Sequence, residues 1–165
     1  AAARIRNFLH DRLWDGSGLR RALDGGRPIG KVSLEDYAYV AYGMAHYAEL
    51  SGDPVDRTFV AVLVNLAWQR FLGDAGWRLD EEPLIPGMAE RGALPEGALP
   101  APSALLIRVA AMSADPDLQA KASAAAELAR ADAQAEPFWH AGHAYALMQL
   151  GGLAVPASTV KGALQ

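Results

Sequence analysis

Two short segments of this sequence each occur twice, in the same order and at nearly the same spacing. Residues 12–20 resemble residues 70–78 at an offset of 58, because both contain an arginine, a glycine six positions later and a second arginine. Residues 51–54 (Ser-Gly-Asp-Pro) resemble residues 113–116 (Ser-Ala-Asp-Pro) at an offset of 62. A repeat of this length, holding two helices and two connections, predicts a helical-hairpin solenoid or toroid. A tetratricopeptide-like adaptor is a weaker alternative, because its period is only ~34 residues.

The composition fits one helical domain and excludes several classes of partner. The chain has 165 residues, of which 52% are hydrophobic, and alanine and leucine supply much of that fraction. The net charge is -4, with no block of basic residues, so we expect no binding to nucleic acid or to a membrane surface. The absence of cysteine excludes disulfides and thiolate metal sites. These features fit a cytoplasmic protein.

Six helices are expected from the spacing of apolar residues and from their capping signals. Ser33 is a good N-cap, and Gly52-Asp53-Pro54 combines a helix stop with the cap and first residue of the next helix. The glycines at 25 and 26 predict a small hairpin. The expected helices cover about residues 1–14, 33–50, 54–72, 103–112, 116–133 and 136–150. We therefore divide the chain into a helical α/α-toroid segment, 1–152, and a C-terminal tail, 153–165.

The connections alternate between long and short, which separates the two ends of the helical array. Long links follow the first and third helices, whereas tight Asp-Pro corners follow the second and fourth. In antiparallel pairs, alternate links lie at opposite ends, so the long links gather at the N-termini of the second and fourth helices. These N-termini carry partial positive charge and suit oxygen-rich or anionic ligands. We expect any functional site at this end.

Several motifs occur in an order that resembles a known family. They are Arg6-Asn7-Phe8-Leu9, Leu13-Trp14-Asp15-Gly16, Leu34-Glu35-Asp36-Tyr37-Ala38-Tyr39, Gly52-Asp53-Pro54 and Glu96-Gly97-Ala98-Leu99-Pro100. Together they resemble the C-terminal (α/α)6-toroid portion of a family that also carries a thioredoxin-like domain. That toroid is similar to those of the N-acylglucosamine 2-epimerases and six-hairpin glycosidases. The similarity covers roughly residues 4–114 and implies an all-α array of three helical hairpins, half of a six-hairpin barrel, with short β-hairpin-like loops.

The chain departs from this family in two ways. It contains no thioredoxin-like domain, and the family pattern Asp-Gly-Ala-x-Pro-Ser-Gly-Asn is altered here to Glu96-Gly97-Ala98-Leu99-Pro100-Ala101-Pro102-Ser103. Three hairpins also make only half of a ring, so one flank is expected to be open. We expect that flank to pair with the missing part of the same protein or with another chain, because apolar flanks are rarely left in water.

The candidate catalytic residues are two carboxylates at the long-loop end. Asp36 lies in the first turn of the second helix, from which sugar-active toroids present acids or bases, and Glu96 lies in the second long link. Glu35, beside Asp36, is a candidate substrate-binding residue. The structural alternative for Asp36 is a capping box with Ser33, and we favour it, although both roles could coexist.

The other candidate substrate-binding residues are Arg20, Tyr37 and Trp77. An arginine can recognise carboxylates or phosphates, and aromatic rings can stack on sugars, but core packing and surface solvation are the commoner roles. His140 and His143 share a helix face, with Glu136 as the only nearby third ligand, so a metal site is a weak interpretation. We assign no metal ligand and no cofactor.

Two functions remain open. The first is a non-catalytic or vestigial toroid domain that acts as a helical scaffold or as a fragment of an assembly. The alternative is a carbohydrate-active domain, epimerase- or glycosidase-like, with a cleft at the inner-helix N-termini. We favour the scaffold, because the stretch after Glu96 is altered and half of the ring is missing.

Overall fold

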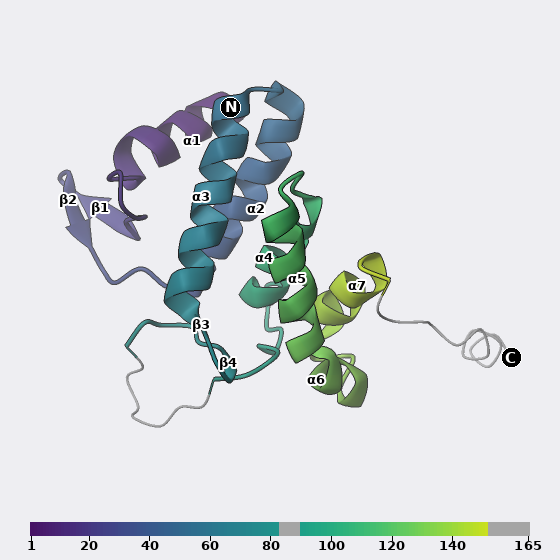
Figure 1. Ribbon diagram of the computed structural model, residues 1–165. Helices are drawn as coiled ribbons and strands as arrows, with labels where there is room; N and C mark the ends of the chain where they lie inside the picture. Colours follow the sequence, from purple (N-terminus) through teal and green to yellow (C-terminus); the bar gives the residue numbers. More distant parts are fainter. Residues whose placement is uncertain (83–89, 152–165) are drawn as a thin grey trace, which may run out of the picture.

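The computed structural model describes residues 1–82 and 90–151, and this part of the chain is mostly helical. Figure 1 shows the helices side by side, with two small β-hairpins on the connections. The α-helices are α1 (Ala2–Phe8), α2 (Leu34–Ser51), α3 (Pro54–Phe71), α4 (Pro102–Met112), α5 (Pro116–Leu128), α6 (Arg130–Ala135) and α7 (Ala141–Gln149). A π-helical turn, Leu9–Leu13, extends α1. The strands are β1 (Ala22–Asp24), β2 (Arg27–Ile29), β3 (Leu72–Gly73) and β4 (Gly76–Trp77).

The two repeated corners use the same hydrogen bonds. Asp53 accepts from the Val55 amide at 2.9 Å, and Asp115 accepts from the Asp117 amide at 2.9 Å, so each aspartate caps the helix that follows. In each corner a serine hydroxyl also accepts from the amide of the capping aspartate. The corners therefore have a common structure, as the repeat predicts.

The longer repeated segments also have equivalent backbone contacts. The Arg20 amide donates to the Leu13 carbonyl at 2.7 Å, and 58 residues later the Arg78 amide donates to the Phe71 carbonyl at 2.9 Å. The bridge between Trp14 and Leu19 likewise corresponds to the pairing of Leu72 with Trp77. Each segment therefore turns the chain back on itself directly after a helix.

The helices pack mainly as neighbouring hairpins. α2 packs against both α3 and α4, and α4 packs against α5 and α7. The guanidinium of Arg108, on α4, lies over the rings of Tyr42 on α2 and Tyr145 on α7, at 5.3 and 4.8 Å from the ring centroids. The core between these elements includes Leu34, Leu63, Leu106, Leu118 and Leu147, all nearly inaccessible to solvent.

Two predicted helix boundaries are wrong. The expected helix 116–133 is divided at Ala129, where α5 ends and α6 begins. The expected helix 136–150 begins only at Ala141, because the Trp139 carbonyl accepts from the Glu96 amide at 2.7 Å, and residues 137–140 form a turn. The predicted tail, 153–165, lies outside the described residues.

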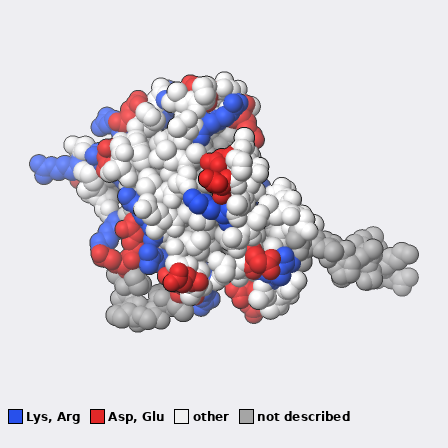
Figure 2. All heavy atoms as spheres, viewed as in Figure 1, with Lys and Arg blue, Asp and Glu red and all other residues white. Residues whose placement is uncertain are grey.

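On the face in Figure 2, acidic and basic side chains are interspersed, both near the centre and around the edge, with uncharged surface between them. Within residues 1–82 and 90–151, no helix combines the length and apolar character needed to span a bilayer.

Candidate functional site

Asp36 is held in a capping box at the start of α2. Its Oδ2 accepts from the Ser33 amide at 2.8 Å and from the Ser33 hydroxyl at 3.0 Å. The nearest guanidinium nitrogen of Arg21 lies 3.9 Å away. The structural alternative for Asp36 is therefore confirmed: its carboxylate satisfies the N-terminus of a helix.

Glu96 has a comparable role at α7. Its Oε1 accepts from the Gly142 amide at 2.5 Å, so a carboxylate from the long link meets the second residue of the helix. A Cβ on Gly142 would lie 2.5 Å from the same oxygen, so the glycine permits this close approach. A negative charge at a helix N-terminus is favourable, and Glu96 therefore anchors the link to α7.

The structure brings Glu35 and Glu96 to the same cavity, of about 420 Å³. Glu35 is exposed and makes no hydrogen bond or ion pair with the described residues. Tyr39 also lines this cavity, and its hydroxyl donates to the Pro100 carbonyl at 3.1 Å. Most of the remaining lining is aliphatic or proline. Two of the predicted site residues therefore meet at the long-loop end, in a largely apolar hollow.

The two predicted aromatic ligands lie in the core. Tyr37 and Trp77 are fully buried, and neither lines that cavity. The Tyr37 hydroxyl accepts from the Leu19 amide at 3.2 Å, and burial raises the pKa of its phenol. Trp77 packs edge-on against Trp68 at 4.9 Å between ring centroids. Both rings hold the repeated loop segments against the helices.

Arg20 lies outside the cavity as well. Its Nε is 3.7 Å from a carboxylate oxygen of Asp15, within the first repeated segment. The equivalent Arg78 instead donates twice to the Arg70 carbonyl, at 2.8 and 3.1 Å. The two repeat-related arginines thus stabilise their own turns.

The sequence did not lead us to predict one polar contact between two helices. The Ser103 hydroxyl and His143 Nε2 lie 2.9 Å apart and link α4 to α7, and both residues are fully buried. The pKa of His143 is lowered to about 4, mainly by burial and secondarily by neighbouring His140, whereas Asp132 opposes the shift. The buried hydroxyl is not accessible to a substrate, so the pair is an interhelical contact. The face shared by His140 and His143 was the only sequence signal for it.

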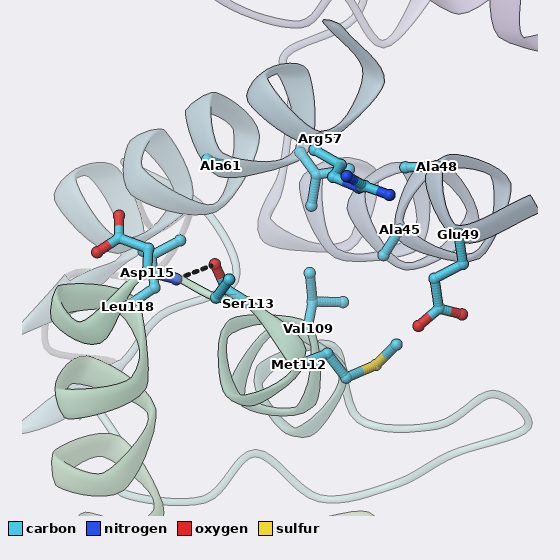
Figure 3. Close-up of a pocket in the computed structure, with 12 residues that line it drawn as sticks. Ala45, Ala48, Glu49, Arg57, Ala61, Val109, Met112, Ser113, Asp115 and Leu118 are labelled. Atoms are coloured by element: carbon cyan, nitrogen blue, oxygen red, sulfur yellow. Dashed lines mark hydrogen bonds between the residues drawn. The ribbon is translucent and has the colours of Figure 1, made fainter. Parts of the chain in front are cut away.

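A second cavity, of about 310 Å³, lies at the corner end, between the hairpins α2–α3 and α4–α5. Its lining is mainly small or aliphatic, and Val109 lies near the centre of the view in Figure 3. Arg57 and Glu49 lie to one side of Val109 and Asp115 to the other. The sequence analysis predicted no cavity at the corner end.

The described residues include no group of three or more His, Cys, Asp or Glu side chains that could hold a metal ion. Comparison of the chain with known proteins finds no matching family, no matching curated protein and no matching solved structure. The resemblance to the toroid family therefore rests on the sequence motifs alone.

Proposed function

We propose that this domain is a non-catalytic helical scaffold. The observation that carries the proposal is the use of the two predicted catalytic carboxylates. Asp36 closes a capping box and Glu96 binds the N-terminus of α7, so each is already engaged in holding a helix end. Tyr37 and Trp77, which a sugar site would present to its ligand, are buried. These candidate residues at the long-loop end therefore stabilise the fold.

The proposed scaffold contacts its partner through the last hairpin. The turn before α7 exposes Phe138 (80%) and Trp139 (54%), and α7 exposes Tyr145 and Met148 by nearly half. Large apolar side chains grouped on one segment are typical of a contact surface. In an array of stacked hairpins, an apolar face of this kind is covered by a neighbouring unit. The partner we propose is therefore a further helical segment, from the same polypeptide or from another.

A carbohydrate-active domain is the second candidate, and one observation favours it. Glu35 and Glu96 line the same cavity, as two acids of a glycosidase or epimerase would. Against it, the Glu96 carboxylate already binds an amide, and among the described residues of that lining Tyr39 is the only aromatic one.

Titration calorimetry separates the two candidates. N-acetylmannosamine and a short oligosaccharide are titrated into the domain at millimolar concentration, and the scaffold predicts no saturable heat. Saturable heat that disappears in Glu35→Gln but persists in Glu49→Gln would overturn the scaffold. Glu49 is the matched control, because it lies on the same helix at the opposite end.

The proposed contact surface needs a separate test. A photo-crosslinking amino acid is introduced in place of Trp139, and the protein is expressed in its native cells. A second variant carries the same amino acid in place of Val62, an exposed apolar position on α3. We expect crosslinks from position 139 to one defined helical segment and none from position 62. Equal, scattered crosslinks from both positions would contradict the assignment.

A further inference from the structure

The cavity at the corner end has apolar walls that come from four helices. On α2 and α3 several of its lining residues are alanines, Ala45, Ala48 and Ala61, and α4 and α5 contribute Val109 and Leu118. The short alanine side chains leave a space of about 310 Å³ between the two hairpins. Because these walls carry no polar group, this space is complementary to an aliphatic group.

Two groups of opposite charge also line the cavity. Arg57 of α3 is exposed, and its guanidinium makes no hydrogen bond or ion pair with the described residues. One carboxylate oxygen of Glu49, on α2, lies 3.4 Å from Nδ1 of His46, and no ion pair joins Glu49 to Arg57 in the described part of the chain. In Figure 3 both side chains lie on the same side of Val109, with Ala45 between them in that view. The apolar space is therefore bordered by a separate cation and anion.

The third charged residue of the lining, Asp115, is already used by the fold. Its Oδ1 accepts from the Asp117 amide at 2.9 Å, and the partial positive charge at the N-terminus of α5 offsets its own charge. In Figure 3 it lies on the other side of Val109 from Arg57 and Glu49. The charges that remain for a ligand are one guanidinium and one carboxylate, which cancel.

A ligand with a single charge would be attracted by one of these groups and repelled by the other. A zwitterion satisfies both, because its carboxylate can pair with a guanidinium while its ammonium pairs with a carboxylate. We propose that this cavity binds an α-amino acid with an aliphatic side chain. Its carboxylate pairs with Arg57, its ammonium pairs with Glu49, and its side chain occupies the apolar space beside Val109. This site is independent of the scaffold role.

The test is an NMR titration at pH 7 that follows the methyl groups of Val109. Norleucine is the probe. Hexanoate has the same chain without the ammonium, pentylammonium has it without the carboxylate, and glycine has both charges without the chain. We expect saturable shifts with norleucine and binding at least about fivefold weaker for each of the other three. Absence of saturable shifts, or equal binding of norleucine and any one of the three, would overturn the proposal.

Two variants with the same charge change test the role of Arg57. Arg57→Gln should weaken the binding of norleucine at least about fivefold without weakening that of pentylammonium. Arg27→Gln, at an exposed position of β2 away from the cavity, should leave the binding of norleucine unchanged. Equal weakening in both variants would show a response to the overall charge and would refute a defined site.

A third variant tests whether the side chain of the ligand enters the cavity. Ala61→Leu places a larger aliphatic group in the apolar space and changes no charge, so it should abolish the saturable shifts. Unchanged binding of norleucine would place the ligand outside the cavity and would refute the proposal. The spectrum of each variant without ligand reports whether its fold is intact.

Discussion

Helix ends are capped differently at the corner end, which holds the two Asp-Pro turns, and at the long-loop end, which holds the long links. At the corners, each helix end is capped within a few residues, by Asp53 in one hairpin and by Asp115 in the other. At the long-loop end, the start of α7 is satisfied by Glu96, 46 residues away in sequence. Each end also contains a cavity, of about 310 Å³ between the hairpins at the corners and about 420 Å³ beside Glu96 at the long-loop end. The difference between the two ends is therefore the sequence distance over which these caps act.

This comparison reverses part of the expectation from sequence. The corner end was expected to be purely structural, yet it contains a largely apolar hollow between the hairpins. The long-loop end was the expected place for any site, with Asp36 and Glu96 as candidate catalytic residues, and there both carboxylates bind helix ends, the role already favoured for Asp36. Polar residues at the N-termini of helices thus have a structural use that must be excluded before a chemical role is assigned.

The largest expected effect is a loss of stability at the long-loop end, from a substitution of Gly76. Gly76 has a φ of 133°, and a Cβ there would overlap the Arg91 backbone. Gly76→Ala should lower the free energy of unfolding by roughly 3 kcal/mol, measured by urea denaturation. Gly97→Ala is the control, because a Cβ at Gly97 meets no atom within 4 Å. Equal stability of the two variants would contradict the tight packing described above.

Acid should weaken the same end through His143. Its pKa is about 4 in the folded protein, against 6.5 in an exposed histidine. Between these values the unfolded chain binds the proton more readily, so stability is lost as the pH falls from 6.5 towards 4. We expect this residue to account for about 2 kcal/mol between pH 7 and pH 4.5.

The variant His143→Gln isolates that contribution. Its free energy of unfolding, measured by urea denaturation at both pH values, should fall less on acidification than that of the wild type. Parallel losses in the two proteins would show that other groups cause the acid sensitivity and that burial of His143 does not.

A smaller effect is expected at the corner end, where the caps are local. Asp115→Ala removes the acceptor for the Asp117 amide and should cost about 1 kcal/mol in unfolding free energy. Asp53→Ala, at the equivalent corner, should cost a similar amount, because its bond to Val55 has the same length. A large difference between the losses of unfolding free energy in the two variants, measured by thermal denaturation, would contradict the equivalence of the repeated corners.

The smallest expected effect is a gain in stability when the cavity at the corner end is filled. Ala61 lines it, and Ala61→Leu adds apolar volume there, which should raise stability by about 0.5 to 1 kcal/mol. Ala124→Leu, at an exposed position of α5, controls for a change of residue without a cavity. A loss of stability in Ala61→Leu alone would show that the corner end is already fully packed.

Local signals in the sequence predicted most of the helices and their corners. Ser33, Asp53 and Asp115 act within a few residues of their partners, so their roles can be recognised from spacing. The division at Ala129 and the late start of α7 could not be predicted, because both occur where a distant loop meets the helices.

The candidate site was predictable only in its location. Sequence reasoning placed Glu35 and Glu96 at one end, and they do line one cavity. The burial of Tyr37 and Trp77 depends on how the two repeated segments fold back over the helices. That packing is determined by long-range contacts, which periodicity in one helix does not report.

The most direct test of the central claim compares two substitutions of Glu96 by urea denaturation. Glu96→Ala should lower the free energy of unfolding by about 1 to 2 kcal/mol, because the Gly142 amide loses its acceptor. Glu96→Gln retains an acceptor without the charge and should lose about half as much. Glu35→Ala removes a carboxylate that lines the same cavity but makes no hydrogen bond with the described part of the chain, so it should change stability by less than about 0.5 kcal/mol. If all three variants unfold like the wild type, Glu96 does not anchor α7 and the scaffold account is contradicted.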